Sequence, residues 1–172
     1  GLNKMLHPRI VNLNGRDMLV TDAQMVGYRE HMTQEHRILF LSGIIGTRCS
    51  NCGGGETESH NLLMALDTLS HDPIRIVITS PGGDLDSTFL FYDTMKLIES
   101  PIIIMGRYCA SAAALLLAAG SKRYLIPHSK VMLHKPWGRQ EGDSRDWEIQ
   151  GKEMKKYESG FINALIECGV TR

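Results

Sequence analysis

Apolar residues gather in short runs along the middle of the chain, and longer stretches with helical spacing separate these runs. The runs lie at 37–41, 74–79, 101–105, 123–126 and 130–133. The first is continuously apolar, as in a strand covered on both faces, and the third has the pattern of a buried strand that breaks at Gly106. We therefore expect five short strands.

The stretches between these runs carry the start and stop signals of helices. Thr21-Asp-Ala-Gln24 resembles a capping box, Pro73 ends the second helix, and Gly120 and Gly169 follow the last two. The expected helices span 22–35, 58–69, 85–99, 111–120 and 146–168. Residues 1–20 show no clear period and predict an irregular arm. Alternating strands and helices with short links predict an α/β fold.

Apolar side chains at helical spacing mark the faces that we expect to be buried or to lie at an interface. The second helix carries Leu62, Leu63, Leu66 and Leu69, the third Phe89, Tyr92, Met95 and Leu97, and the fifth Ile149, Tyr157, Phe161, Leu165 and Ile166. A chain of 172 residues is long enough for one domain with a sizeable core. We divide it into an arm and helix at 1–36, a βαβ head with the candidate catalytic residues at 37–136, and a final segment with the long helix at 137–172.

The amino-acid composition argues against some classes of function and indicates where the protein is located. The formal net charge is zero, which argues against binding to nucleic acid or to a membrane surface, because both need a basic excess. No apolar run approaches the length of a membrane span, and the N-terminus lacks a signal-peptide core. We expect a cytoplasmic location. The leading glycine leaves open that a targeting segment was removed, in which case an organelle stroma or matrix is expected.

The four cysteines are too few for a disulfide framework and favour a reducing compartment. Cys49 and Cys52 form one Cys-x-x-Cys pair in a glycine-rich loop at 42–56. A structural zinc site needs four ligands, no second pair exists, and His60 is expected on a helix face. We favour loop cysteines in a tolerated surface insertion over a metal or redox site, and we expect no metal and no cofactor.

Ser111 stands where the apolar run at 101–105 gives way to a helix of small and apolar residues. Serine is a good N-cap, and that interpretation is the simpler one locally. The alternative is a nucleophile at a helix start, where backbone N–H groups stabilise an oxyanion. Two other strand ends favour the alternative. Ser80-Pro-Gly-Gly83 supplies a turn that allows close backbone approach, and the run at 130–133 leads into His134.

The order of these motifs resembles the proteolytic subunits of the Clp protease family. The resemblance covers the chain from about Arg37 onward. It rests on five motifs in order, namely Ser80-Pro-Gly-Gly83, Tyr92-Asp-Thr-Met95, Met105-Gly106, Ala110-Ser-Ala112 and Val131-Met-Leu-His-Lys-Pro136. It implies a crotonase-like spiral of βαβ units with a protruding handle helix. Within that fold it implies a serine endopeptidase that cuts unfolded polypeptides into short peptides.

The resemblance also implies roles for individual residues. Ser111 would be the nucleophile and His134 the general base, with the N–H groups of Gly83 and Ala112 forming the oxyanion hole. An extended substrate would lie between two backbone segments, which are Gly83, Asp84 and Leu85 on one side and Trp137, Gly138 and Arg139 on the other. The implied assembly is two stacked heptameric rings, homomeric or mixed, joined through the handle at 137–146 and its helix. The implied partner is an ATP-driven Clp unfoldase.

The chain departs from the family pattern in three places. No acid occupies the position of the third triad member, and Asp84, Asp86, Asp143 and Asp146 are only the nearest acids by sequence. Either the chain omits a C-terminal segment, or it is a shortened homologue. Arg75 and Val77 stand where relatives often carry the aromatic residues that dock the ATPase. Asp84 and Asp86 are unusual after the turn; they favour basic substrates or, in the interpretation we prefer, belong to a helix N-terminus.

Two other functions compete with the peptidase. A catalytically silent subunit of a mixed ring would fit the missing acid, although it has no need of both Ser111 and His134. An acyl-CoA-binding enzyme of the same broad fold would use paired backbone N–H groups without needing either side chain.

Overall fold

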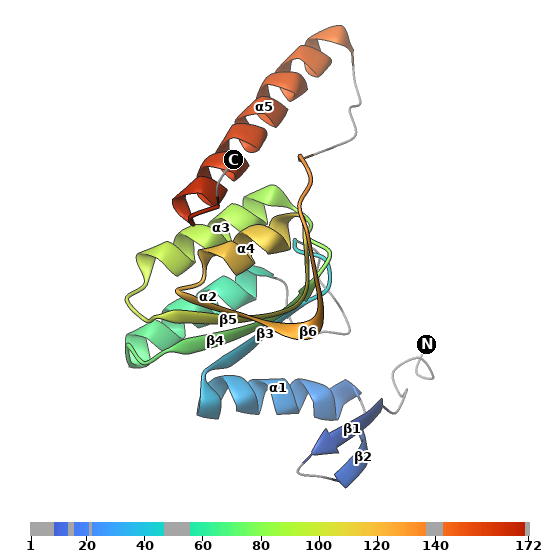
Figure 1. Ribbon diagram of the computed structural model, residues 1–172, viewed down its shortest axis with the longest axis vertical. Coiled ribbons are helices and arrows are strands. Elements are labelled where there is room, and N and C mark those ends of the chain that lie inside the picture. The colour runs from blue at the N-terminus through green and yellow to red at the C-terminus, as the bar shows by residue number, and fades with distance from the viewer. Residues whose placement is uncertain (1–8, 14–15, 21, 47–55, 137–142, 171–172) are drawn as a thin grey trace.

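The centre of the molecule is a four-stranded parallel sheet (Figure 1). The computed structural model describes residues 9–13, 16–20, 22–46, 56–136 and 143–170. The strands are β3 (Ile38–Ser42), β4 (Ile74–Ser80), β5 (Ile102–Ala110) and β6 (Lys122–Met132), paired in that order. Helices α2 (Glu56–Leu69), α3 (Leu85–Leu97) and α4 (Ala112–Ala119) connect successive strands. This alternation confirms the predicted α/β fold.

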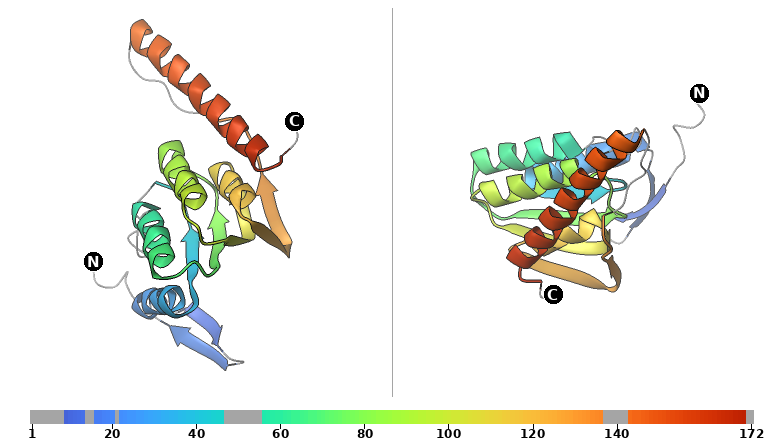
Figure 2. Two further views of the ribbon diagram at one scale, coloured as in Figure 1. Left: turned by 90° about the vertical axis from the view of Figure 1, so that its left-hand side faces the viewer. Right: turned by 90° about the horizontal axis from the view of Figure 1, so that it is seen from above.

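The core lies between the sheet and one layer of helices, since α2, α3 and α4 lie on the same side of the sheet (Figures 1 and 2). Ile74, Ile76 and Ile78 of β4 are buried in this core, whereas Arg75 is exposed on the other face. The alternation is that of a half-covered strand, because successive side chains point to opposite faces.

The second face of the sheet is covered at the edge strand β3 but not at the inner strand β5. Helix α1 (Asp22–His36) contacts β3, and the guanidinium of Arg29 lies 5.9 Å from the centre of the Phe40 ring. The strand β5, expected to be buried, exposes 42 % of Met105. That prediction is wrong for one face of β5, since that face carries no helix in the described part of the chain.

The N-terminal region is more regular than predicted. Strands β1 (Arg9–Leu13) and β2 (Arg16–Val20) pair antiparallel, so the prediction of an irregular arm is wrong. The two strands, RIVNL and RDMLV, mix charged or amide residues with apolar ones and do not alternate regularly, so the sequence pattern did not mark them as strands. The sequence signal that marks the pair is Asn14-Gly15 between the two apolar runs, a dipeptide typical of hairpin turns.

Two predictions about β5 and β6 are also wrong. The strand β5 does not break at Gly106 but continues to Ala110, and 123–126 and 130–132 lie within one strand rather than two. The pairing shifts register beside Gly106, where Ser129 Oγ donates to the Gly106 carbonyl over 2.8 Å. A Cβ at Gly106 would lie 2.8 Å from Leu125 Cδ2, so glycine serves close packing within the strand.

The buried faces of the helices are narrower than the sequence pattern suggests. Leu63, Leu66, Tyr92, Met95 and Phe161 are buried as expected. The side chains exposed in the single chain, and therefore outside its core, are Leu62, Leu69, Leu97, Ile149 and Ile166; an interface role for them stays a prediction. Two of the exposed leucines are the last residues of α2 and α3, where the helix runs past the sheet.

Helix α5 (Ser144–Glu167) protrudes from the rest of the molecule (Figure 2). A capping box between Asp143 and Asp146 begins it. Only its C-terminal part packs on the head, through buried Phe161 and Ala164. The protruding helix agrees with the expected handle, and the division at 36 and 136 stays a prediction. None of the described helices is long and apolar enough to cross a membrane.

Candidate functional site

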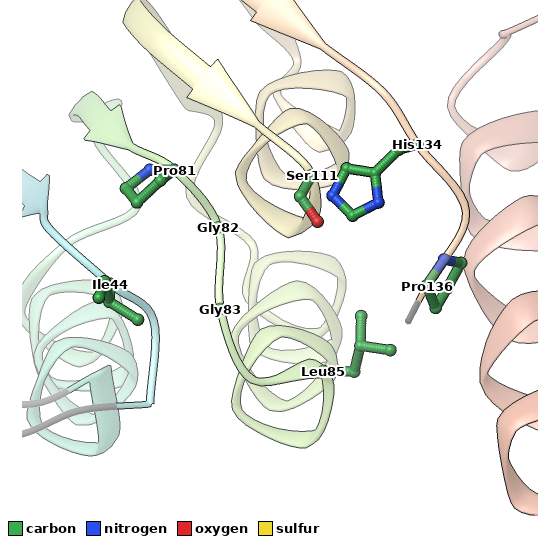
Figure 3. A pocket seen from close by; sticks show the side chains of 8 residues that line it. All are labelled: Ile44, Pro81, Gly82, Gly83, Leu85, Ser111, His134 and Pro136. Atoms are coloured by element: carbon green, nitrogen blue, oxygen red, sulfur yellow. The ribbon is translucent and has the colours of Figure 1, made fainter. Parts of the chain in front are cut away.

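Three loops meet where the parallel strands end at their carboxyl edge, the usual place for a ligand site in such sheets. The chain leaves β4 at the Pro81-Gly-Gly turn, leaves β5 at Ser111 and leaves β6 toward His134. Between them lies a cavity of about 450 Å³ (Figure 3). It is lined by Ile44, Pro81, Gly82, Gly83, Leu85, Ser111, His134 and Pro136.

Ser111 has a strained backbone and a side chain that does not cap its helix. Its φ is 56° and its ψ is −124°, a conformation rare for residues other than glycine. It occupies the N-cap position of α4 but makes no side-chain capping hydrogen bond, so the N-cap interpretation is wrong. Its N–H donates to the Met132 carbonyl over 2.8 Å. Strain of this kind gathers at functional sites, and here it aims the hydroxyl at the cavity (Figure 3).

The glycine turn lies directly against Ser111. Gly82 has a φ of +94°, and a Cβ there would lie 2.7 Å from the Ala110 carbonyl oxygen and 2.8 Å from Ser111 Cβ. Its N–H donates to Ser80 Oγ over 3.1 Å. The N–H of Gly83 has no partner among the described residues, and Gly83 is exposed where it lines the cavity. The free donor of this turn is therefore Gly83.

Ala112 supplies a second free donor. It is the first residue of α4, whose N–H groups have no partner within the helix, and no described residue accepts from it. A Cβ at Gly82 would lie 3.0 Å from the Ala112 nitrogen, so this N–H group lies against the turn. The partial positive charge of the helix start adds to both donors.

Residues that the sequence analysis missed hold the turn in place. Ser80 is fully buried, and its Oγ donates to the Gly43 carbonyl over 2.6 Å. Ile45 donates to the Gly82 carbonyl and accepts from the Asp84 N–H, each over 2.9 Å. Ile45 is 1 % exposed, so this residue of the expected 42–56 loop belongs to the core. Residues 47–55 lie outside the described residues, and the surface insertion stays a prediction. The sequence signal that could have identified Ser80 is its place as the first residue of the Ser80-Pro-Gly-Gly motif.

His134 is half-buried, and its imidazole points toward the Ser111 hydroxyl (Figure 3). Its Nδ1 lies 2.6 Å from the Lys135 carbonyl oxygen. A carbonyl only accepts, so Nδ1 carries the hydrogen in this arrangement. The neutral ring then leaves Nε2 free to accept a proton from the serine.

The four acids considered from the sequence are engaged elsewhere. Asp84 caps α3 by accepting from the Ser87 N–H over 2.8 Å, as the helix-terminus interpretation expects. Asp86 accepts from the Tyr157 hydroxyl over 2.8 Å, and this bond raises the pKa of Tyr157. Asp143 and Asp146 form the capping box of α5. Within the described residues, no carboxylate contacts His134.

Two further ionisable side chains near the site have raised pKa values. Lys135 Nζ lies 2.9 Å from Glu158 Oε1, and this hydrogen-bonded ion pair raises the pKa of Lys135. Cys109, two residues before Ser111, is fully buried, and burial raises the pKa of its thiol to about 11. A buried neutral thiol is inert, so Cys109 is no candidate nucleophile.

The remaining predicted residues are placed as follows. Leu85 lines the cavity, whereas Asp84 caps α3 and is not among the lining residues. Trp137, Gly138 and Arg139, and also Cys49 and Cys52, lie outside the described residues. The described residues contain no group of three or more side chains that could hold a metal ion.

Comparison with known proteins identifies the family. The Clp protease family pattern matches residues 24–169. The ATP-dependent Clp protease proteolytic subunit 1 of Rhodopirellula baltica is 32 % identical over 176 residues, which cover 92 % of this chain and 75 % of that protein. The protein of the same name from Protochlamydia amoebophila is 33 % identical over 152 residues, 85 % of this chain and 71 % of that protein. The chain belongs to the Clp protease family.

Proposed function

We propose that this chain is a serine endopeptidase subunit that hydrolyses unfolded polypeptides through an acyl-enzyme. The observation that carries the proposal is the cavity in which Ser111, His134 and the Gly82-Gly83 turn meet. A hydroxyl, an imidazole and free backbone N–H groups around one cavity are the parts that acyl transfer needs.

The mechanism follows from these positions. Ser111 Oγ attacks the carbonyl carbon of the peptide bond, and His134 Nε2 takes the proton of the serine hydroxyl. The tetrahedral oxyanion accepts hydrogen bonds from the N–H groups of Gly83 and Ala112. His134 then gives the proton to the leaving amine, and water attacks the acyl-enzyme with His134 again as the base. The free N–H of Gly83, beside the engaged N–H of Gly82, supports this choice of donor.

Substrate binding uses the cavity walls. The side chains of Ile44, Pro81, Leu85 and Pro136 make these walls apolar, which favours an apolar residue next to the scissile bond. The extended substrate pairs with the backbone of Gly83, Asp84 and Leu85 on one side and of Trp137, Gly138 and Arg139 on the other. Hydrogen bonds to the substrate backbone depend little on the substrate's side chains, so we expect cleavage with broad sequence specificity.

Family membership supports an assembly of stacked rings that works with an ATP-driven unfoldase in the cytoplasm. Arg75 is exposed and Val77 is half-buried on the face of β4 that α2 and α3 leave open. Neither is aromatic, so the docking contact with the ATPase differs in chemistry from the usual one.

One observation favours a second function. Because no described carboxylate contacts His134, a silent subunit that shapes a mixed ring is the alternative. Membership of the Clp protease family gives no support to the acyl-CoA-binding alternative.

Hydrolysis of an unstructured polypeptide and of short fluorogenic peptides separates the two functions. We expect new peptide ends with the wild type, and a loss of about a thousandfold or more in Ser111→Ala and His134→Ala. His128→Ala, an exposed histidine on β6 away from the cavity, is the matched control and should retain activity. A folded wild type that cleaves nothing would support the silent subunit instead.

A further inference from the structure

The strand end that carries His134 is tied to helix α5 by one ion pair. Lys135, the residue after His134, places its Nζ 2.9 Å from Glu158 Oε1. Lys135 is exposed, but Glu158 is only 33 % exposed and stands three residues before buried Phe161. Glu158 therefore sits on the part of α5 that is packed against the head, which gives the ion pair a rigid anchor.

Lys135 also provides the acceptor for His134. Its carbonyl oxygen lies 2.6 Å from His134 Nδ1 and belongs to the peptide bond with Pro136. The residue before a proline is confined to extended backbone conformations. With few backbone conformations open to Lys135, the position of its side chain limits the direction of its carbonyl.

His134, Lys135 and Glu158 also line a common apolar groove of about 200 Å³ beside the active-site cavity. Leu133, Pro136, Phe161, Ile162 and Leu165 complete its walls. The Lys135 side chain is 83 % exposed, so water screens this ion pair, but its partner Glu158 is held at the wall of the groove.

We infer, on the basis of the proposed peptidase function, that Lys135 and Glu158 are positioning residues for His134. Their ion pair holds the Lys135 carbonyl against Nδ1 and so keeps the neutral imidazole in the tautomer whose Nε2 faces Ser111. This arrangement supplies the orienting part of what a triad carboxylate does. It does not supply the negative charge that stabilises the imidazolium.

The tautomer of His134 tests the inference without any need for activity. In protein with ¹⁵N-labelled histidine, the two ring nitrogens of the neutral imidazole report which one carries hydrogen. We expect Nδ1–H in the wild type and a mixture with Nε2–H in Glu158→Gln and in Lys135→Met. The His134→Asn spectrum assigns the signals. Glu148→Gln removes a similar ion pair, to Lys152, from the protruding part of the same helix and should change nothing.

The rate of reaction of Ser111 with a fluorophosphonate gives the second readout. The interaction energy of an ion pair with one exposed partner is small, so we expect the rate constant to fall only about two- to fivefold in either single variant. The exchanged pair, Lys135→Glu with Glu158→Lys, should restore both the rate and the tautomer. Circular dichroism checks that each variant is folded.

The outcomes separate this inference from the proposed function. An unchanged tautomer in both folded single variants, or an exchanged pair that restores nothing, would overturn the positioning role. A wild type that does not react with the probe would overturn the peptidase proposal, while the tautomer measurement would still decide whether the pair orients the ring.

Discussion

At the scale of single residues, the site depends on a strained serine held by a close glycine. The backbone conformation of Ser111, with a φ of 56°, raises the free energy of the folded state by about 1–3 kcal/mol, and the surrounding contacts must offset this strain. One of these contacts is its N–H bond to Met132, and another is the turn at Gly82, which leaves no room for a Cβ. The position of the nucleophile is therefore set by backbone packing rather than by its own side chain.

Replacing Gly82 with alanine tests this packing. Gly82→Ala adds both a conformational penalty at positive φ and a clash with Ala110 and Ser111, so we expect destabilisation by more than about 1 kcal/mol and loss of Ser111 reactivity. Gly43→Ala is the matched control, because its φ is +90° but nothing lies within 4 Å of the added Cβ. Urea unfolding and probe labelling measure the two effects. Equal losses in both variants would mean that the close approach has no role.

Sequence reasoning found the reacting side chains but not the groups that orient them. Ser111 and His134 could be predicted because each follows an apolar run, and parallel strand ends share one edge of the sheet. Ser80 stands in the Ser-Pro-Gly-Gly motif, which was the available signal for it. Ile45 and Lys135 could not be predicted, because they act through hydrogen bonds of their own backbone. Such contacts depend on the folded path of the chain and leave no pattern of residue types.

At the scale of elements, polar contacts fix the edge of the sheet opposite the site. Asp67 near the end of α2 accepts from the N–H and the Oγ of Ser100, over 2.8 and 2.6 Å, just before β5 begins. Arg37 adds bonds to the Leu66 and Ser70 carbonyls. The hydrogen bond from the Ser100 hydroxyl, followed by the Ser100 and Glu99 N–H groups and His71, holds the pKa of Asp67 well below its ordinary value of 3.8.

This lowered pKa predicts how stability depends on pH. The ionised Asp67 stabilises the fold at pH values above its unfolded pKa near 3.8, and that contribution fades as the pH falls below it toward the folded pKa. We expect the free energy of unfolding of the wild type to exceed that of Asp67→Asn at pH 7, with the gap closing below pH 4. Asp93→Asn, an exposed site on α3, controls for loss of one charge. A gap that stays constant from pH 7 to pH 3 would contradict the role of Asp67.

The elements themselves were largely predictable, with errors that have physical causes. All five expected helices form, because their caps and apolar spacing are local signals. The expected break at Gly106 fails because glycine there allows close packing with Leu125 rather than a turn. The β1–β2 pair was missed because its strands mix charged or amide residues with apolar ones and do not alternate regularly.

At the scale of the whole molecule, the outer part of the sheet is apolar and exposed. The exposed side chains on β5, β6 and the residue after β6 are Met105, Tyr108, Tyr124, Leu125, Ile126, Val131, Met132 and Leu133. Apolar side chains exposed in this number on two neighbouring strands mark an interaction site. In the ring assembly that we propose, a neighbouring subunit covers this surface.

A charge placed on this surface tests the assembly. Tyr124 is 54 % exposed on β6, and Tyr124→Asp would bury a carboxylate against apolar side chains if the surface pairs with a neighbour. We expect sedimentation velocity to show a large wild-type assembly and smaller species for the variant. Leu69→Asp, at an exposed leucine away from this surface, is the control. A wild type that sediments as a single 19.2 kDa chain would contradict the assembly.

The most direct measurement is the intact mass of the folded protein after treatment with a fluorophosphonate. We expect one adduct per chain, carried by Ser111 in the mapped peptides and absent from Ser111→Ala. That result would mean that His134 and the free N–H groups activate the serine. An unmodified wild type, or an adduct that persists in Ser111→Ala, would contradict the assignment of Ser111 as the nucleophile.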